Sequence, residues 1–240
     1  MPYYYGYGFD WTYLVIVLPC IILSMWASSS VNSTFKKYSS VYSYRRITGA
    51  EAAQRVLSAN GVRNVRIERV SGNLTDHYDP RTNVIRLSDS VYNSASVAAI
   101  GVACHEAGHA VQYAENYGPI KLRAAIIPIT NFGSKIAMPL ILIGILLSAL
   151  GDISYTFVYL GIAAFSLSLV FQLITLPVEF NASRRAMQAI EQGNILSEEE
   201  QRGARRTLKA AAMTYVAATA VALAQLLRLI ILFGGRRRRD

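Results

Sequence analysis

Cysteine, histidine and charged residues are all scarce in this chain. Its 240 residues include 2 cysteines and 3 histidines, and only 16% of them are charged. Cys20 and Cys104 form no CxxC pair, which excludes a disulfide framework and a cysteine-rich zinc module. We interpret both as small buried apolar residues. So few charges also argue against an ordinary soluble domain.

Apolar residues, in contrast, are abundant. They make up 52% of the chain, and the mean hydropathy is +0.28. A membrane helix needs roughly 20 apolar residues that rise about 1.5 Å each. The composition therefore predicts a mainly α membrane protein with about four membrane helices. The apolar runs are Trp11–Ala27, Ile136–Leu150, Ile153–Val178 and Ala210–Leu227.

The first run reads as an uncleaved anchor rather than a signal peptide. No positive charge precedes it in MPYYYGYGFD, whereas Lys36, Lys37, Arg45 and Arg46 follow it. Positively charged loops stay on the cytoplasmic side, so the N-terminus is expected outside and regions 36–135 and 184–209 in the cytoplasm. The same bias explains the net charge of +9 without a nucleic-acid partner, for which no motif is present.

The last apolar run leaves two interpretations open. Gln225 and Arg228 interrupt it, and a full span would place Arg236–Arg239 outside, against the charge rule. The run is therefore either a fourth span or a helix at the interface whose arginines contact anionic headgroups.

The polar segments have recognisable helix and strand signals. Thr48 and Glu51 form a capping box before a short helix, and Ser197 and Glu200 form another before the final helix. Two strand-like runs, Val65–Val70 and Asn83–Leu87, flank a turn-rich stretch and predict a β-hairpin. A helix is expected over Ala95–Tyr117, ending at Gly118-Pro119, which gives a small α+β domain.

That helix contains HEAGH, the main chemical signal of the sequence. Residues i and i+4 share a helix face, so His105 and His109 can bind one Zn²⁺, and Glu106 beside them can act as a general base on water. Random placement of these residue types would give HExxH only about 0.001 times per chain. Gly108, costly inside a helix, predicts the close approach of another element.

A catalytic zinc needs a third protein ligand and an open fourth position. Two residues qualify by type: Glu179, directly after an apolar run, and His77, the remaining histidine, in the turn-rich LTDHYDP. Two histidines with one glutamate are a standard catalytic shell. The residues therefore favour Glu179 and leave His77 open.

Further site residues follow by type and position. Ser183, four residues after Glu179, is on the same helix face and is a candidate to orient a ligand histidine. His77, Tyr78 and Arg184 are candidates to stabilise the oxyanion. The strand Asn83–Leu87 is a candidate to pair with an extended substrate, although a lone strand is more often structural.

The order HEAGH, two apolar runs and EFNAS resembles membrane gluzincins of the HtpX and CAAX prenyl protease class, in which HExxH precedes ExxxD. TDHYDPRTNVIRLS, HEAGH and LPVEFNASRRA together resemble the YugP-like neutral zinc metallopeptidases over nearly the whole chain. The resemblance implies that Glu179 is the third ligand of one Zn²⁺ per chain. The chain departs from the wider class at Ser183, where an aspartate is usual.

We therefore expect a multi-pass cell-membrane metalloendopeptidase that hydrolyses membrane-associated peptides or proteins with metal-activated water, with membrane protein quality control as its role. The catalytic site is expected on the cytoplasmic face. The alternatives are a non-catalytic scaffold held by zinc and a lipid-binding protein. The expected domains are an anchor (1–30), a zincin-like gluzincin domain (31–127), a transmembrane hairpin (128–177), a helix with the third ligand (178–209) and a C-terminal membrane helix with a basic tail (210–240).

Overall fold

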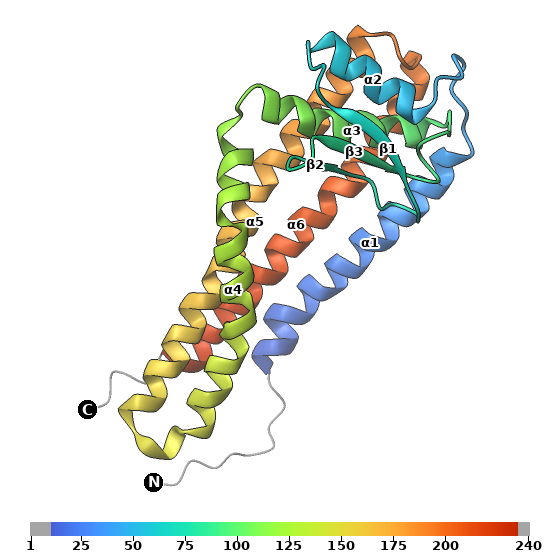
Figure 1. Ribbon diagram of the computed structural model, residues 1–240. Helices are drawn as coiled ribbons and strands as arrows, with labels where there is room; N and C mark the ends of the chain where they lie inside the picture. Colours follow the sequence, from blue (N-terminus) through green and yellow to red (C-terminus); the bar gives the residue numbers. More distant parts are fainter. Residues whose placement is uncertain (1–10, 235–240) are drawn as a thin grey trace. The chain divides into compact units, whose positions relative to one another are not determined.

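The computed structural model describes residues 11–234 (Figure 1). Most of these residues are helical, and one small sheet is present. The elements are the π-helix Tyr13–Val17, α1 (Leu18–Ser39), α2 (Gly49–Ala59), β1 (Arg66–Val70), β2 (His77–Asp79), β3 (Val84–Ser88), α3 (Val97–Ala114), α4 (Gly118–Leu146), the 3₁₀ turn Ser148–Leu150, α5 (Asp152–Gln192) and α6 (Glu198–Gly234).

The chain divides into two compact units. Among the described residues, the helical unit comprises 11–26, 126–173 and 217–234, and the sheet unit comprises 27–125 and 174–216. Helices α1, α4, α5 and α6 each contribute residues to both units. All of α2, α3 and the sheet belong to the sheet unit.

Four helices are long and apolar enough to cross a membrane, which confirms the expected mainly α membrane protein. They are Tyr13–Ser39, Gly118–Leu146, Asp152–Gln192 and Glu198–Gly234. The last of these helices meets the length and composition requirements for a membrane span, although it contains Gln225 and Arg228. Arg236–Arg239 and the leader MPYYYGYGFD lie outside the described residues.

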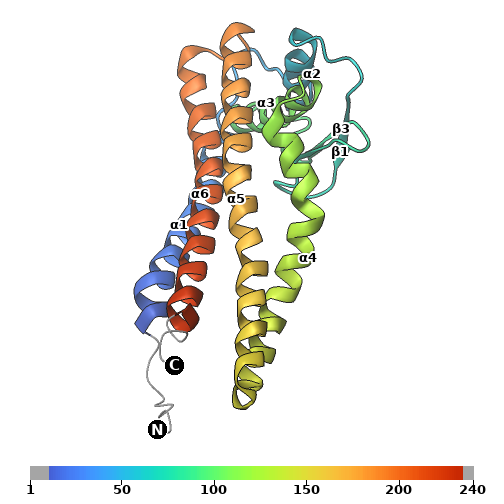
Figure 2. The same cartoon turned by 90° about the vertical axis from the view of Figure 1, so that its left-hand side faces the viewer.

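In the helical unit, α4 and α5 run side by side as the expected hairpin (Figure 2). The chain reverses near Gly151, whose φ is +67°. Glycines bring the two backbones close: a Cβ on Gly144 would lie 2.8 Å from Ser154 O, and one on Gly161 would lie 2.8 Å from Ala137 O. Small residues at such contacts are typical of membrane helix pairs.

Helix α5 corrects one expected boundary. The sequence predicts that the apolar helix stops before Pro177 and that a new helix follows, but α5 continues through Pro177 to Gln192. Membrane helices tolerate an internal proline because neighbouring groups compensate for the lost backbone hydrogen bond. Glu179 is therefore held on a continuous helix rather than at the start of a new one.

The helix signals of the sheet unit are confirmed. Thr48 and Glu51 make reciprocal capping bonds at α2, and Ser197 and Glu200 do the same before α6. Helix α3 ends at Ala114, close to the predicted end, and Asn116 follows with a φ of 58°. Asparagine is among the few residues that adopt this left-handed conformation readily.

The predicted β-hairpin is wrong. Strands β1 and β3 pair in parallel, and the segment between them supplies a third strand, β2, which pairs antiparallel with β3. The strand order is β1-β3-β2, so β3 is central. A turn-rich stretch of this length has room for a crossover, and a short edge strand with little apolar character gives a weak sequence signal.

Helix α3 lies at the centre of the sheet unit. Of its 18 residues, 13 are buried, and it packs against α2 and near β2 and β3. Gly108 allows a close helix contact, because a Cβ at this position would lie only 2.8 Å from Ala182 O of α5. At Gly101 a Cβ would lie 3.5 Å from Ala204 Cβ of α6, which is an ordinary packing distance. The close approach predicted at Gly108 is therefore present, and it brings α5 against the HEAGH segment.

Candidate metal centre

Three side chains from α3 and α5 converge in the sheet unit. His105 Nε2 and His109 Nε2 lie 3.3 and 3.5 Å from the same oxygen, Glu179 Oε2. One ligand atom from each residue can be chosen so that all lie within 4.8 Å of one another. The four-residue spacing puts both imidazoles on one face of α3, and the Gly108–Ala182 contact brings α5 to that face.

This donor set fits a zinc ion. Two imidazole nitrogens and one carboxylate oxygen are a catalytic zinc shell, and bonds of about 2.0–2.1 Å in a tetrahedron separate neighbouring ligands by about 3.3–3.4 Å. The two measured distances, 3.3 and 3.5 Å, are close to that value. Glu179 Oε2 is also buried without a hydrogen-bond partner among the described residues. A buried carboxylate oxygen in this state is costly unless a cation satisfies it.

The other ring nitrogens of both histidines have partners of their own. His109 Nδ1 lies 3.0 Å from Gln112 Oε1, and His105 Nδ1 lies 3.2 Å from Ser183 Oγ. Gln112 is fully buried and donates from Nε2 to the backbone oxygen of Val178, next to Glu179. Contacts of this kind fix the ring orientation of metal-binding histidines.

A largely buried ion pair holds Glu179, the third candidate ligand. Arg123 of α4 donates from a guanidinium nitrogen to Glu179 Oε1 at 2.8 Å, and only 2% of the Glu179 side chain is exposed. The pair occupies one carboxylate oxygen and leaves Oε2 directed at the histidines. Because a lone buried charge is strongly unfavourable, Arg123 stabilises Glu179 in its ionised, metal-binding form.

A cavity of about 410 Å³ opens onto this centre. His105, Glu106 and Glu179 line it, and its other walls come from α1, α6 and the segment before β2. Apolar side chains, among them Phe35 and Leu208, form part of the lining. A free carboxylate next to a two-histidine, one-glutamate cluster, at the wall of a partly apolar cavity, is an arrangement suited to hydrolysis.

Asp76 is a third acidic residue of the cavity wall, besides Glu106 and Glu179. Its carboxylate accepts hydrogen bonds from Ser88 N at 2.7 Å and from Ser88 Oγ at 3.0 Å. Burial raises the pKa of Asp76, the bonds from Ser88 oppose this, and the negative charge of Glu106 raises the pKa further. Asp76 therefore anchors the segment before β2 to β3, and its carboxyl group interacts electrostatically with Glu106.

Cys104 does not contribute a thiolate, although it precedes His105. The side chain is fully buried, and burial raises the pKa of its thiol to about 12. A neutral thiol is neither a zinc ligand nor a nucleophile. The structure thus agrees with Cys104 as a small buried apolar residue.

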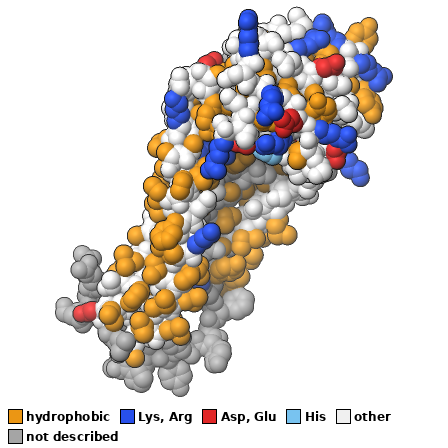
Figure 3. Space-filling model, viewed as in Figure 1, with side chains coloured by type: hydrophobic (Ala, Val, Ile, Leu, Met, Phe, Trp, Pro, Cys, Tyr) orange, Lys and Arg blue, Asp and Glu red, His pale blue; other side chains and the backbone are white. Residues whose placement is uncertain are grey.

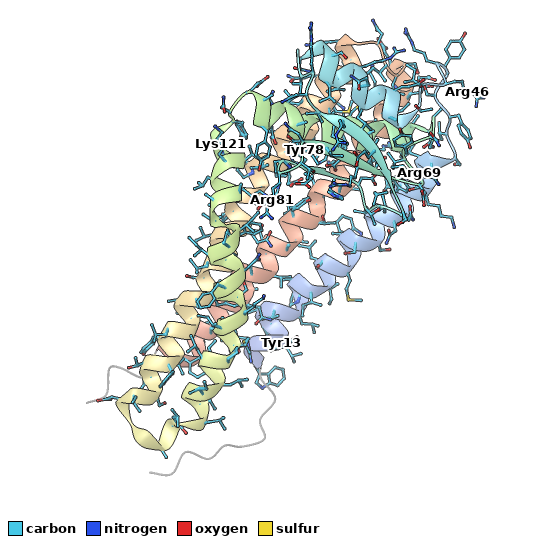
Figure 4. The ribbon with its side chains drawn as sticks, in the orientation of Figure 1. Tyr13, Arg46, Arg69, Tyr78, Arg81 and Lys121 are labelled. Carbon is cyan, nitrogen blue, oxygen red and sulfur yellow. The ribbon has the colours of Figure 1, made fainter. Side chains whose placement is uncertain are left out.

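The remaining predicted site residues do not line the cavity of the candidate metal centre. His77 is exposed on β2, and its Nδ1 lies 2.8 Å from Thr75 O. Tyr78, labelled in Figure 4, donates its hydroxyl to Asn83 Oδ1 at 2.6 Å, and burial raises its pKa. Arg184 is exposed and lines a different groove. None of the three lines the cavity that contains Glu106.

Three residues of the centre were missed from the sequence: Gln112, Arg123 and Tyr215. Tyr215 of α6 lines the cavity and interacts with Glu179. Gln112 follows His109 by three residues, a spacing that suits a helix-face contact. Arg123 and Tyr215 are polar residues near or within apolar runs, where such side chains usually face the protein interior and have functional roles.

Comparison with known proteins agrees with this chemistry. The family described as "Putative neutral zinc metallopeptidase" matches residues 13–234. The chain belongs to this family. It is also 48% identical over 221 residues to the "Putative membrane protease YugP" of Bacillus subtilis (strain 168), covering 92% of this chain and 96% of that protein. No solved structure matches the chain. The resemblance to the YugP-like neutral zinc metallopeptidases is confirmed, and family membership implies zinc.

Replacing Gln112 by methionine is expected to weaken zinc binding about 10–100-fold, the usual effect of losing a partner that orients a ligand histidine. Gln112→Met keeps the side-chain volume but removes the acceptor for His109 Nδ1. Competition with a chromophoric chelator measures the affinity. Gln54→Met on α2, where Gln54 is exposed and contacts Ser58, is the matched control. Equal zinc affinity in both variants would show that Gln112 does not orient the ligand.

Proposed function

We propose that the protein is a membrane-embedded zinc metalloendopeptidase of the gluzincin type. The observation that carries the proposal is the convergence of His105, His109 and Glu179. Two members of this cluster, His105 and Glu179, line one cavity together with Glu106. Family membership supports zinc and peptidase activity, and the four apolar helices support a membrane location.

In the proposed mechanism, His105, His109 and Glu179 hold one zinc ion. Zinc in such a shell acidifies water and polarises a carbonyl group. Glu106 accepts the proton of the attacking water and passes it to the leaving amine. Ser183 and Gln112 fix the imidazole orientations, and Arg123 keeps Glu179 ionised, so the ligand atoms are positioned before substrate arrives.

An extended polypeptide is the substrate that suits the cavity. Strand β3 is not available for substrate pairing because β1 and β2 occupy both of its sides. The outer side of β2 is a sheet edge, and the segment just before it, with Leu74 and Asp76, lines the cavity. We therefore assign substrate pairing to this edge instead of Asn83–Leu87.

The charge distribution supports a site on the cytoplasmic face. Lysine and arginine side chains gather over the sheet unit, and hydrophobic side chains dominate the surface of the helical unit (Figure 3). Basic segments remain on the cytoplasmic side of membrane proteins. Membrane-associated or unfolded proteins are the proposed substrates, and membrane protein quality control is the proposed role.

A non-catalytic scaffold is the main alternative. A zinc ion that only held α3 and α5 together would need neither a carboxylate outside the ligand set nor a cavity beside it. Glu106 and the 410 Å³ cavity therefore favour the enzyme. A function carried only by Arg236–Arg239 would predict that the cavity residues are dispensable.

Removing the metal is expected to abolish cleavage of casein by the purified protein. A strong chelator, followed by its removal, should leave an inactive apoprotein, and stoichiometric Zn²⁺ should restore activity because the ligand set survives. Elemental analysis reports the metal content at each step, and a serine-protease inhibitor is the negative control. Full activity in protein shown to be metal-free would overturn the proposal.

A further inference from the structure

A second cavity lies between α5 and α6 within the sheet unit. It encloses about 470 Å³ and combines cationic with apolar side chains. Residues that line it include Phe180, Arg184, Met187, Arg205, Lys209 and Met213. We refer to it as the interfacial groove.

The sequences of α5 and α6 both change between uncharged and charged at this groove. On α5, no charged residue occurs between Asp152 and Glu179, and Arg184 is the first cation that follows. On α6, Lys209 is the last cation before an uncharged stretch that continues to Arg228. Spanning helices change in this way where hydrocarbon gives way to lipid headgroups. The groove is therefore at headgroup level on both helices.

The groove has an excess of positive charge. Of its three cations, Arg205 pairs with Glu191 at 2.6 Å. Arg184 and Lys209 are exposed and have no acidic partner within 4 Å among the residues that the structure describes. A phosphate group between these two side chains would be neutralised by charge-assisted hydrogen bonds.

The apolar lining points to a lipid rather than a free anion. Phe180 is 44% exposed, whereas Met187 and Leu208 are nearly buried and contribute to the groove. A soluble phosphate would gain nothing from these side chains, whereas an acyl chain would bury apolar area against them. We propose that the interfacial groove binds an anionic phospholipid, with its phosphate between Arg184 and Lys209 and an acyl chain along Phe180 and Met213.

The groove shares part of its wall with the metal centre. Ser183, Leu208 and Ala212 line both cavities, and Ser183 contacts His105 Nδ1. A lipid in the groove would therefore lie one side chain away from a ligand histidine. A bound lipid could therefore influence the candidate metal centre through Ser183. Lipid binding itself does not depend on the proposed peptidase activity.

Fluorescence quenching tests the lipid site in the full chain. Phe180→Trp is introduced with Trp11→Phe and Trp26→Phe, so that a single tryptophan lines the groove. Reconstituted protein is compared in two series of phosphatidylcholine vesicles, one with increasing fractions of brominated phosphatidylglycerol and one with increasing fractions of brominated phosphatidylcholine. We expect the brominated phosphatidylglycerol to reach half-maximal quenching at a fraction about 10- to 30-fold lower, since each of the two cations contributes a factor of up to about five near a membrane surface.

Charge variants decide whether Arg184 and Lys209 are responsible. Arg184→Gln with Lys209→Gln should make both lipids quench equally, whereas Arg184→Lys with Lys209→Arg should preserve the preference. Arg63→Gln with Arg202→Gln, outside the groove, removes the same charge and should also preserve it. Equal quenching in the parent, or a preference that survives in the first pair, would overturn the proposal. Loss of the preference in millimolar inorganic phosphate at constant ionic strength would instead identify a site for free phosphate.

Discussion

A Glu106→Gln variant is expected to keep its zinc and to lose about 10²- to 10⁴-fold in the rate of casein cleavage. Glu106 lines the cavity beside His105 but is outside the ligand set. Glutamine keeps the size of the side chain but cannot accept the proton of water, and a positioned general base contributes a factor of this size. Zinc content by elemental analysis and initial cleavage rates are the two measurements.

The matched control for this variant is Glu198→Gln. Glu198 is exposed in the first turn of α6, so the same chemical change there should alter neither zinc nor rate. Unimpaired cleavage by Glu106→Gln would remove Glu106 as the base. Loss of zinc with loss of cleavage would place Glu106 in the ligand set and contradict the geometry.

A Glu179→Ala variant is expected to lose zinc affinity by more than 100-fold, beyond the effect of removing a partner of a ligand. The change removes one of three ligands and leaves the Arg123 guanidinium in a largely buried position without its carboxylate. Glu179→Gln separates these effects because an amide oxygen still accepts from Arg123 but binds zinc poorly. Chelator competition with purified protein measures all affinities.

His77→Ala is the comparison that distinguishes the two third ligands considered from the sequence. His77 is exposed on β2 and belongs to no ligand cluster among residues 11–234, so its removal should leave the zinc affinity unchanged. Near-wild-type affinity in Glu179→Ala, or a large loss in His77→Ala, would contradict the proposed shell.

Local signals in the sequence were sufficient for most helices. The capping boxes at Thr48 and Ser197, the helix with His105 and His109, and the reversal near Gly151 depend on neighbours a few residues apart, and all are present. Gly108 predicted a close contact without revealing its partner, which is Ala182. Spacing of three or four residues also gave the Ser183 position, which faces His105.

Contacts between segments that are distant in the chain could not be predicted from the sequence. The parallel pairing of β1 with β3 depends on the path of the segment that connects them, and the strand in that segment, β2, is only three residues long. Arg123 meets Glu179 across 56 positions. Polar side chains in apolar helices usually face the protein interior, but their positions in the sequence do not show which of them contact one another. Arg184, chosen by residue type as an oxyanion donor, instead lines the interfacial groove.

The separation of the ligands along the chain also sets an order in time. His109 is made about 70 residues before Glu179, and synthesis at about 5–20 residues per second takes roughly 4–14 s over that distance. During this interval the nascent chain has two ligands and the general base but no third ligand. The α4–α5 hairpin must also form before Glu179 reaches α3. The proposed peptidase is therefore latent while it is being made, so nearby nascent membrane proteins are not exposed to it during this interval.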